Sequence, residues 1–404
     1  MTEPALFDLA IVILVIWGLL ANKLTFRAAH GVPASMVAAL TVAQLVSLWS
    51  PLDLTRGLWF LAVTLYLTLS MLFFSGVTSA FGLRAVRLIA VTYAISGVVA
   101  VLLGAFGYYV AGPWQSTLLL YGRPKGLFKD PNVFGPYLVL MAVGALAWLI
   151  SYRRHRFITA AVLLIAAFGV FISFSRAAWL NCLLSVAAYV PLRLISLRSP
   201  SERKALLKKA AVPALLLIGA AFVVVSLPGM QEMLSNRIGN NGLQSYDTER
   251  FAAHEEAFRT ALAHPFGIGP GQWEFWYYMS VHSTYYRVLS ENGFAALGIL
   301  IFLLGASLYR SVRLALTAPS DSWRNLYAVM SACMLGLLLN SAVVDTLHWR
   351  HLWLVLGVIW TSRPAAVRPP RVRSSIAREQ SSRAAGLRLP EASGQKSIGH
   401  RIHA

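Results

Sequence analysis

Eleven long apolar runs, separated by short polar stretches, constrain what this chain can fold into. A transmembrane helix needs about 17–25 predominantly apolar residues, and most of the runs meet that length. Of the 404 residues, 57% are hydrophobic and only 13% are charged, whereas soluble domains carry roughly 25% charged residues. We therefore predict an all-α polytopic membrane protein with about eleven transmembrane helices, the first and last being short. The predicted spans are residues 5–20, 32–49, 57–75, 86–110, 132–150, 157–174, 177–196, 211–227, 285–308, 325–342 and 346–362.

The basic residues alternate between the two sides of these helices. Loops on one side, together with the tail after residue 362, hold 25 of the 35 Lys and Arg residues, and the opposite loops hold 8. Because cytoplasmic loops carry the basic excess, we predict an extracytoplasmic N-terminus and a cytoplasmic C-terminus. The net charge of +19 is mostly this topology signal, so we do not expect nucleic-acid binding.

Composition divides the chain into two parts. Residues 1–362 are expected to form the helical bundle, including a large extracytoplasmic loop over 228–284. Residues 363–404 are rich in Arg, Ser and Pro without apolar periodicity, which predicts a disordered basic cytoplasmic tail. Its expected role is to reinforce the topology, and contact with anionic lipid headgroups is the alternative.

The loop 228–284 is longer than a simple connection, and long loops in compact proteins are usually functional. Within it, residues 247–263 form a predicted amphipathic helix with Phe251, Phe258 and Leu262 on one face. Such a helix would lie along the outer surface of the bundle or at the lipid interface.

A glycine cluster follows this helix at residues 264–273 (HPFGIGPGQW). It lacks the Lys-Ser/Thr ending of a nucleotide-binding loop. The glycines predict a tight backbone turn at a place where another segment packs closely. A purely structural turn and a contact with substrate both remain open.

His282 precedes the ninth predicted span. Ser283 or Thr284 can cap that helix, which leaves His282 at its extracytoplasmic mouth. A neutral imidazole there can accept a proton, although a histidine considered alone is more often an ordinary surface residue. Arg287 and Glu291 are four residues apart on the same helix and are expected to pair.

Arg176 lies in the only interruption of the apolar stretch 157–196. The lengths of the flanking helices place this interruption at an extracytoplasmic turn. An arginine at a helix start opposes the helix dipole and gains nothing as a cap. The functional interpretation is a fixed cation for a phosphate, and the alternative is snorkelling to lipid headgroups.

A third polar segment, residues 123–132 (RPKGLFKDPN), precedes the fifth span. Asp130 fits a helix N-cap and Pro131 fits the first helical turn. A capped helix start next to Arg123 and Lys125 can bind an anion, and these bases break the positive-inside pattern. Interaction with lipid phosphates is the alternative.

These segments occur in order as residues 126–132 (GLFKDPN), 175–177 (SRA), 264–269 (HPFGIG), 282–285 (HSTY) and 291–293 (ENG). Together they resemble the O-antigen ligase and polysaccharide polymerase superfamily, over roughly residues 120–300. The resemblance implies a C-type membrane glycosyltransferase of the bacterial inner membrane. Such enzymes move a glycan from undecaprenyl diphosphate to an acceptor hydroxyl on a lipid or glycan, with inversion and without a metal.

The resemblance also implies roles for particular residues. His282 would activate the acceptor as the base, and Arg176 and Arg250 would hold the diphosphate. Arg123 and Lys125 match the family's basic entry to the helix that begins at Asp130 and Asn132. Ser283 departs from the pattern, because many relatives have Asn after the histidine.

A transporter of polysaccharide or lipid is the alternative function. A carrier is expected to have functional polar residues near mid-membrane and often paired halves. This chain has almost no ionisable residue at mid-span, which favours the enzyme. No Asp-x-Asp pair or His/Asp cluster suggests a metal, and no cofactor is expected. Whether the enzyme would be a ligase or a polymerase is left open.

Overall fold

The computed structural model of the chain describes residues 6–152, 154–226, 231 and 245–362. The chain divides into a unit of Met1–Ser362 and a second unit, Arg363–Ala404, that lies outside the described residues. The predicted disordered tail and residues 228–230 and 232–244 of the predicted loop therefore stay predictions.

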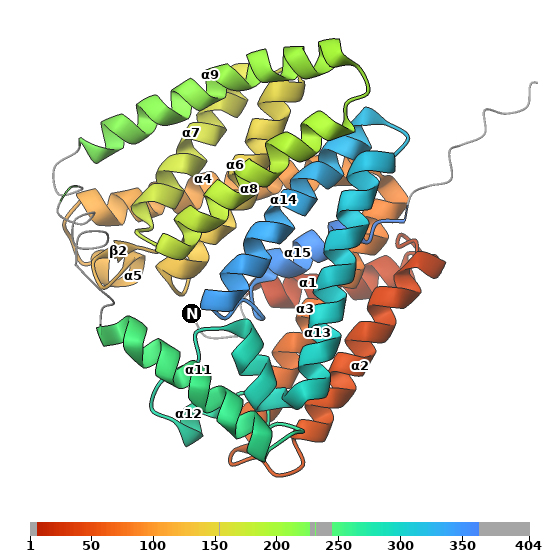
Figure 1. Cartoon of the computed structure of the whole chain (residues 1–404), viewed down its shortest axis with the longest axis vertical. Coiled ribbons are helices and arrows are strands. Elements are labelled where there is room, and N and C mark those ends of the chain that lie inside the picture. The colour runs from red at the N-terminus through yellow and green to blue at the C-terminus, as the bar shows by residue number, and fades with distance from the viewer. Residues whose placement is uncertain (1–5, 153, 227–230, 232–244, 363–404) are drawn as a thin grey trace, which may run out of the picture. The chain divides into compact units, whose positions relative to one another are not determined.

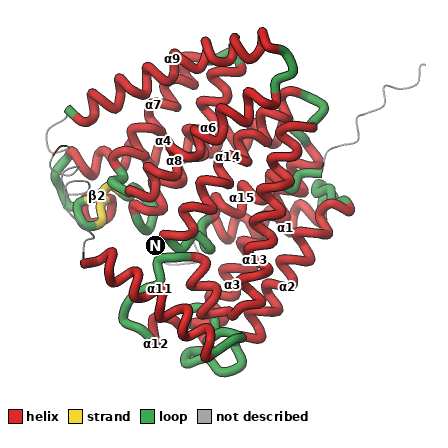
Figure 2. The backbone as a smooth tube through the Cα atoms, in the orientation of Figure 1, coloured by secondary structure: helices red, strands yellow, loops and turns green. Residues whose placement is uncertain are grey.

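Each predicted span overlaps a helix of the structure, although the bounds differ (Figure 1). The helices are α1 (Leu6–Leu20), α2 (Gly31–Ser47), α3 (Leu54–Phe81), α4 (Leu83–Tyr109), α6 (Pro131–Ser151), α7 (Arg156–Ile172), α8 (Arg176–Ser196), α9 (Pro200–Val225), α13 (Thr284–Thr317), α14 (Asp321–Val343) and α15 (Arg350–Ile359). The shorter elements are η1 (Ala28–His30), α5 (Gln115–Leu118), α11 (Ser245–Ala263) and α12 (Trp273–Trp276). The predicted all-α architecture is confirmed, apart from two short strands, β1 (Leu119–Leu120) and β2 (Arg123–Pro124), which pair antiparallel (Figure 2).

Within the described residues, seven helices are long and apolar enough to cross a membrane. They are α2 (extended by η1), α3, α4, α6, α8, α13 and α14, and shorter apolar helices lie in α1, α7 and α15. The chain is thus a polytopic helical membrane protein, and eleven crossings remain a prediction.

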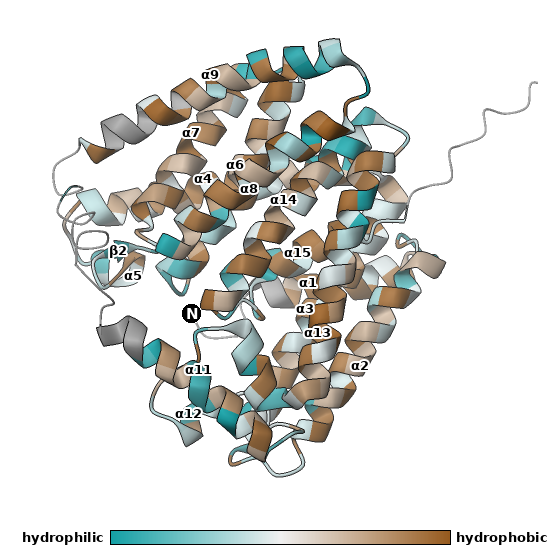
Figure 3. Cartoon of the chain, viewed as in Figure 1, coloured by the Kyte–Doolittle hydropathy of each residue, from teal (hydrophilic) through white to brown (hydrophobic). Residues whose placement is uncertain are grey.

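Many large apolar side chains of the helices are exposed, and hydrophobic residues run along most of the helices (Figure 3). Leu20 is 84% exposed in α1, Leu88 is 66% exposed in α4 and Ile218 is 66% exposed in α9. Water would not solvate so much apolar surface favourably, whereas lipid does. Inside the bundle, small residues allow close helix contacts, as in other membrane proteins. Gly336 of α14 lies against Asn181 and Ser185 of α8, leaving no room for a Cβ atom.

Polar side chains at the helix starts define where the helices begin. Asp130 caps α6 by accepting a hydrogen bond from the Asn132 backbone nitrogen at 2.6 Å. Ser283 caps α13 through the Tyr286 nitrogen. Both caps were predicted and both are confirmed. Ser175 caps α8 in the same way, so Arg176 is the first residue of that helix.

Candidate functional site

His282 lies at the mouth of α13 and is half-buried. Four charged side chains from different elements influence its imidazole: Arg250 of α11, Asp130 before α6, Arg287 of α13 and Asp345 between α14 and α15. Burial and then the Arg250 guanidinium lower the pKa of His282 below its ordinary value, and the two carboxylates oppose that shift. The imidazole is therefore held mainly neutral at neutral pH, the form that can accept a proton.

Arg250 connects the end of α14 to the mouth of α13. Its Nη2 atom donates to the carbonyl oxygen of Val343, the last residue of α14, and lies 3.4 Å from the carbonyl oxygen of His282. A cation at a helix C-terminus is favoured by the helix dipole. The structure thus brings together two residues that the sequence places in separate motifs.

The start of α6 and the start of α8 are also joined by hydrogen bonds. Asn132 Oδ1 accepts from Ser175 Oγ at 2.8 Å and from Arg123 Nη2 at 3.2 Å. Arg123 is buried, and its Nη2 and Nε atoms donate to the Ser173 carbonyl oxygen at 3.0 and 3.2 Å. The two segments therefore form one assembly that presents Arg176, which is exposed.

The other bases of this assembly differ in their surroundings. Lys125 is half-buried and Lys129 is exposed. The contacts of Arg123 place its guanidinium against protein carbonyl and amide oxygens, where it holds the turn before α8. A diphosphate contact from Arg123, as from Lys125, stays a prediction. Asp130 links the two groups, because it caps α6 and also acts electrostatically on His282.

Two residues near His282 were not singled out from the sequence. Asp345 accepts a hydrogen bond from Arg287 Nη1 at 3.2 Å, and its Oδ1 accepts from the Leu347 nitrogen at 3.1 Å. The signal that could have found it is its position as the only carboxylate in the loop 343–350. His254 follows Arg250 by four residues, a spacing that puts both side chains on one helix face.

The glycine cluster is a tight turn, as predicted, and it packs against a kink in α13. Gly293 interrupts the helix with φ of 83° and ψ of 178°. A Cβ atom there would overlap the Pro265 carbonyl oxygen, and a Cβ atom at Gly267 would overlap the Glu291 carbonyl oxygen. Gly269 N donates to the same Glu291 oxygen at 2.8 Å. The close packing of two backbones explains the need for glycine at these positions.

A buried charge network supports this turn. The predicted pair of Arg287 and Glu291 is confirmed, with an N–O distance of 3.3 Å. Arg287 also contacts Glu274 at 2.9 Å and Asp345 at 3.2 Å, and Glu274 in turn contacts Arg56 of α3 at 2.8 Å. The network joins α3, α12, α13 and the loop before α15 beside His282.

The predicted amphipathic helix is present as α11, which packs on α13 (Figure 1). Its small residues Ala253, Ala257 and Ala261 are buried. Phe251 and Phe258, from the predicted apolar face, are 59% and 45% exposed. The aromatic face thus points away from the protein.

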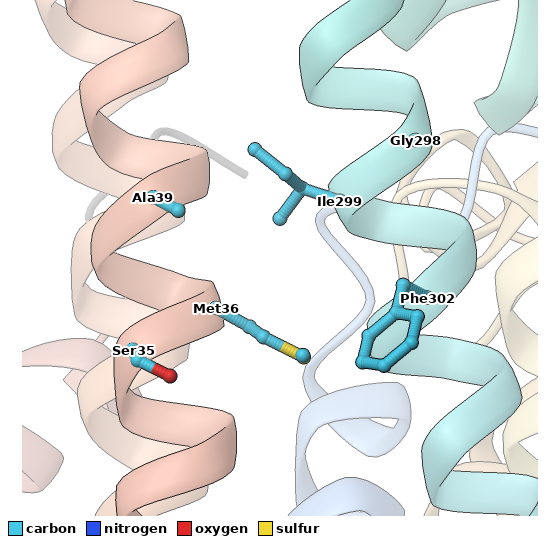
Figure 4. A pocket seen from close by; sticks show the side chains of 6 residues that line it. All are labelled: Ser35, Met36, Ala39, Gly298, Ile299 and Phe302. Carbon is cyan, nitrogen blue, oxygen red and sulfur yellow. The ribbon is translucent and has the colours of Figure 1, made fainter.

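A groove of about 440 Å³ lies apart from these residues, between α2 and α13 (Figure 4). It is lined by Ser35, Met36, Ala39, Gly298, Ile299 and Phe302. Its lining is almost entirely apolar and holds none of the predicted site residues.

Fold and site together define a multi-pass helical membrane protein with a cationic and imidazole-bearing site around the mouth of α13. Residues 160–303 match the model of a family described as O-antigen ligase, which confirms the predicted resemblance to the O-antigen ligase and polysaccharide polymerase superfamily. The matched segment contains Arg176, Arg250 and His282. It supports a glycosyltransferase-type membrane enzyme, a ligase or polymerase of glycans. A search of curated proteins found no match.

Proposed function

We propose that the chain transfers a glycan from undecaprenyl diphosphate to an acceptor hydroxyl on the extracytoplasmic face of the bacterial inner membrane. The observation that carries this proposal is the pairing of a mainly neutral imidazole, His282, with the guanidinium of Arg250 that contacts its backbone. A base and a fixed cation at one place are what transfer from a diphosphate leaving group requires.

In the proposed reaction, His282 takes the proton of the acceptor hydroxyl. The hydroxyl oxygen attacks the anomeric carbon from the face opposite the leaving group, so the configuration inverts. The bond between the anomeric carbon and the phosphate oxygen breaks, and its electron pair leaves with the diphosphate. Arg176 and Arg250 stabilise the charge that develops there, a role that fixed cations can fill without a metal.

The remaining predicted residues also contribute to binding of the diphosphate. Lys125 and Arg123 add positive charge beside the start of α6, where Asp130 and Asn132 shape the helix N-terminus. Arg123 acts through its hydrogen bonds to Ser173 and Asn132, which hold the turn that carries Arg176.

The proposed topology has eleven crossings, the extracytoplasmic loop 228–284, an outer N-terminus and an inner C-terminus. The alternating basic loops support this orientation. In it, His282, Arg176 and Arg250 all lie on the extracytoplasmic side. No soluble nucleotide donor is expected in that compartment, so a donor delivered through the bilayer suits the site.

The proposal is tested with purified protein in lipid, a lipid-linked glycan donor and a glycan or lipid acceptor. Wild type should form the transferred product, and His282→Ala should lower the rate by about 10²–10⁴-fold while still binding donor. His155→Asn serves as a control on an exposed histidine outside these motifs. Wild-type turnover in His282→Ala would refute the base assignment. Movement of the donor across the bilayer without any transfer would indicate a transporter instead.

Surface glycans from a deletion strain separate the two enzyme types. Loss of O-chains from the lipid core indicates a ligase. Chains reduced to a single repeat indicate a polymerase.

A further inference from the structure

His254 of α11 lies near His282 and Arg250, the base and one of the cations of the proposed site. Its imidazole stacks on the ring of Tyr286, with centroids 4.6 Å apart and an angle of 12° between the planes. The backbone of His282 lies near enough to the imidazole to act on its pKa as a hydrogen-bond acceptor. Because Arg250 Nη2 approaches the His282 carbonyl oxygen as well, α11 contacts the mouth of α13 through both residues.

The chemistry of the ring indicates why a histidine occupies this position. The Nε2 atom of His254 is buried and has no hydrogen-bond partner in the part of the chain that the structure describes. A buried polar atom without a partner costs about 1–3 kcal/mol. Phenylalanine would keep the stacking on Tyr286 and avoid that cost. The contribution that only histidine can make here is therefore a polar contact from its other nitrogen, Nδ1, to the nearby His282 backbone.

The charge state of His254 is compatible with this contact. Burial and then the Arg250 guanidinium lower its pKa, and the His282 backbone, as a hydrogen-bond acceptor, opposes the shift. A neutral ring can donate through Nδ1 without repelling the neighbouring guanidinium.

We propose that His254 is a positioning residue that sets the imidazole of His282 relative to the guanidinium of Arg250. The inference rests on the proposed function, in which these two groups act on the acceptor and the diphosphate. They lie on different elements, and a misplacement of about 1 Å between reacting groups can cost 10²-fold in rate. The hydrogen bond of Arg250 to Val343 does not involve His254, so donor binding should persist while the base moves.

The pH dependence gives a readout that packing alone would not change. The charged groups that act on His282 are Arg250, Asp130, Arg287 and Asp345. Of these, Arg250 lowers its pKa most. If the contact from His254 is lost and His282 separates from Arg250, the pKa of His282 rises. The acid limb of the transfer rate should then lie at higher pH.

The experiment compares wild type, His254→Phe and His254→Asn with the control His155→Asn, an exposed histidine outside the motifs of the proposed site. His254→Phe should lower kcat by about tenfold to a hundredfold, leave KM for the donor within about threefold, and shift the acid limb upward. His254→Asn, which restores a donor near the Nδ1 position, should recover part of the rate. His155→Asn should behave as wild type.

Unchanged kcat and an unchanged acid limb in His254→Phe would overturn the inference, as would a rise in donor KM with kcat intact. If His254→Phe does not yield folded protein, His254→Leu, which also lacks the donor, is judged by the same three quantities. His282→Ala in the same assay separates the two proposals. Full activity in His282→Ala refutes the proposed base, whereas an impaired His282→Ala beside a normal His254→Phe refutes only the positioning role.

Discussion

Replacing Arg287 with Gln should destabilise the protein strongly, because it breaks a buried charge network. The Arg287 side chain is 10% exposed and contacts Glu274, Glu291 and Asp345. Glu274 keeps Arg56 as a partner, and the Asp345 side chain is 20% exposed. Glu291 is 3% exposed; it would keep its hydrogen bonds from the Gly271 and Trp273 nitrogens, but its buried charge would lose its cation. Removing one partner of a buried ion pair costs about 3–5 kcal/mol, which we expect for Arg287→Gln.

The measurement is the thermal unfolding midpoint of purified protein in one detergent, followed by tryptophan fluorescence. A matched control is Arg259→Gln, because Arg259 pairs with Glu255 at the same four-residue spacing but both side chains are 66% exposed. Exposed pairs contribute about 0–1 kcal/mol. The midpoint should fall by at least about 5 °C in Arg287→Gln and by about 2 °C or less in the control.

A double replacement tests whether the unpaired carboxylate is the cause. Arg287→Gln with Glu291→Gln should recover part of the midpoint lost in the single variant, because no buried charge is then left at position 291. Equal midpoints for wild type and Arg287→Gln would refute the reasoning. The reasoning would also fail if the midpoint of the double variant fell by more than the sum of the falls in the two single variants.

Three further predictions follow from the site and the topology. Arg176→Lys keeps the charge but loses the planar fork that binds phosphate oxygens, so transfer should fall about tenfold or more; full activity at normal protein levels would make this residue a headgroup anchor. Without the native cysteines, Asn240→Cys should react with a membrane-impermeant thiol reagent on intact cells and Pro200→Cys should not; the reverse pattern would invert the bundle. Gly293→Ala should abolish folded protein on size exclusion because its Cβ overlaps a carbonyl oxygen, whereas Gly298→Ala, with open space around it, should be tolerated.

Local features of the fold were predictable from the sequence, because their causes lie within a few residues. The apolar runs predicted each of the long helices. Asp130 and Ser283 accept hydrogen bonds from nitrogens two and three residues later. Arg287 and Glu291 pair across a single helical turn.

Contacts between distant segments were not predictable in the same way. Arg123 donates to a carbonyl 50 positions away, and Arg287 meets Asp345 at a separation of 58. Such contacts depend on how whole helices pack, which a single sequence does not specify. His254 was missed for this reason: its role depends on His282, which α11 reaches only in the folded bundle. The glycine cluster was recognisable as a tight turn, but its packing partner at Gly293 was not.

The pH dependence of transfer shows whether His282 is the base. If neutral His282 is the base, the rate falls as the imidazole is protonated. Because burial and Arg250 lower the pKa of His282, the midpoint of the acid limb should lie below about 6.5, the ordinary value. The assay measures single-turnover transfer by protein in lipid from about pH 4.5 to 8, for wild type and His282→Ala. We expect an acid limb in wild type and a low, pH-independent rate in the variant. The same limb in His282→Ala, or wild-type turnover by that variant, would contradict this assignment.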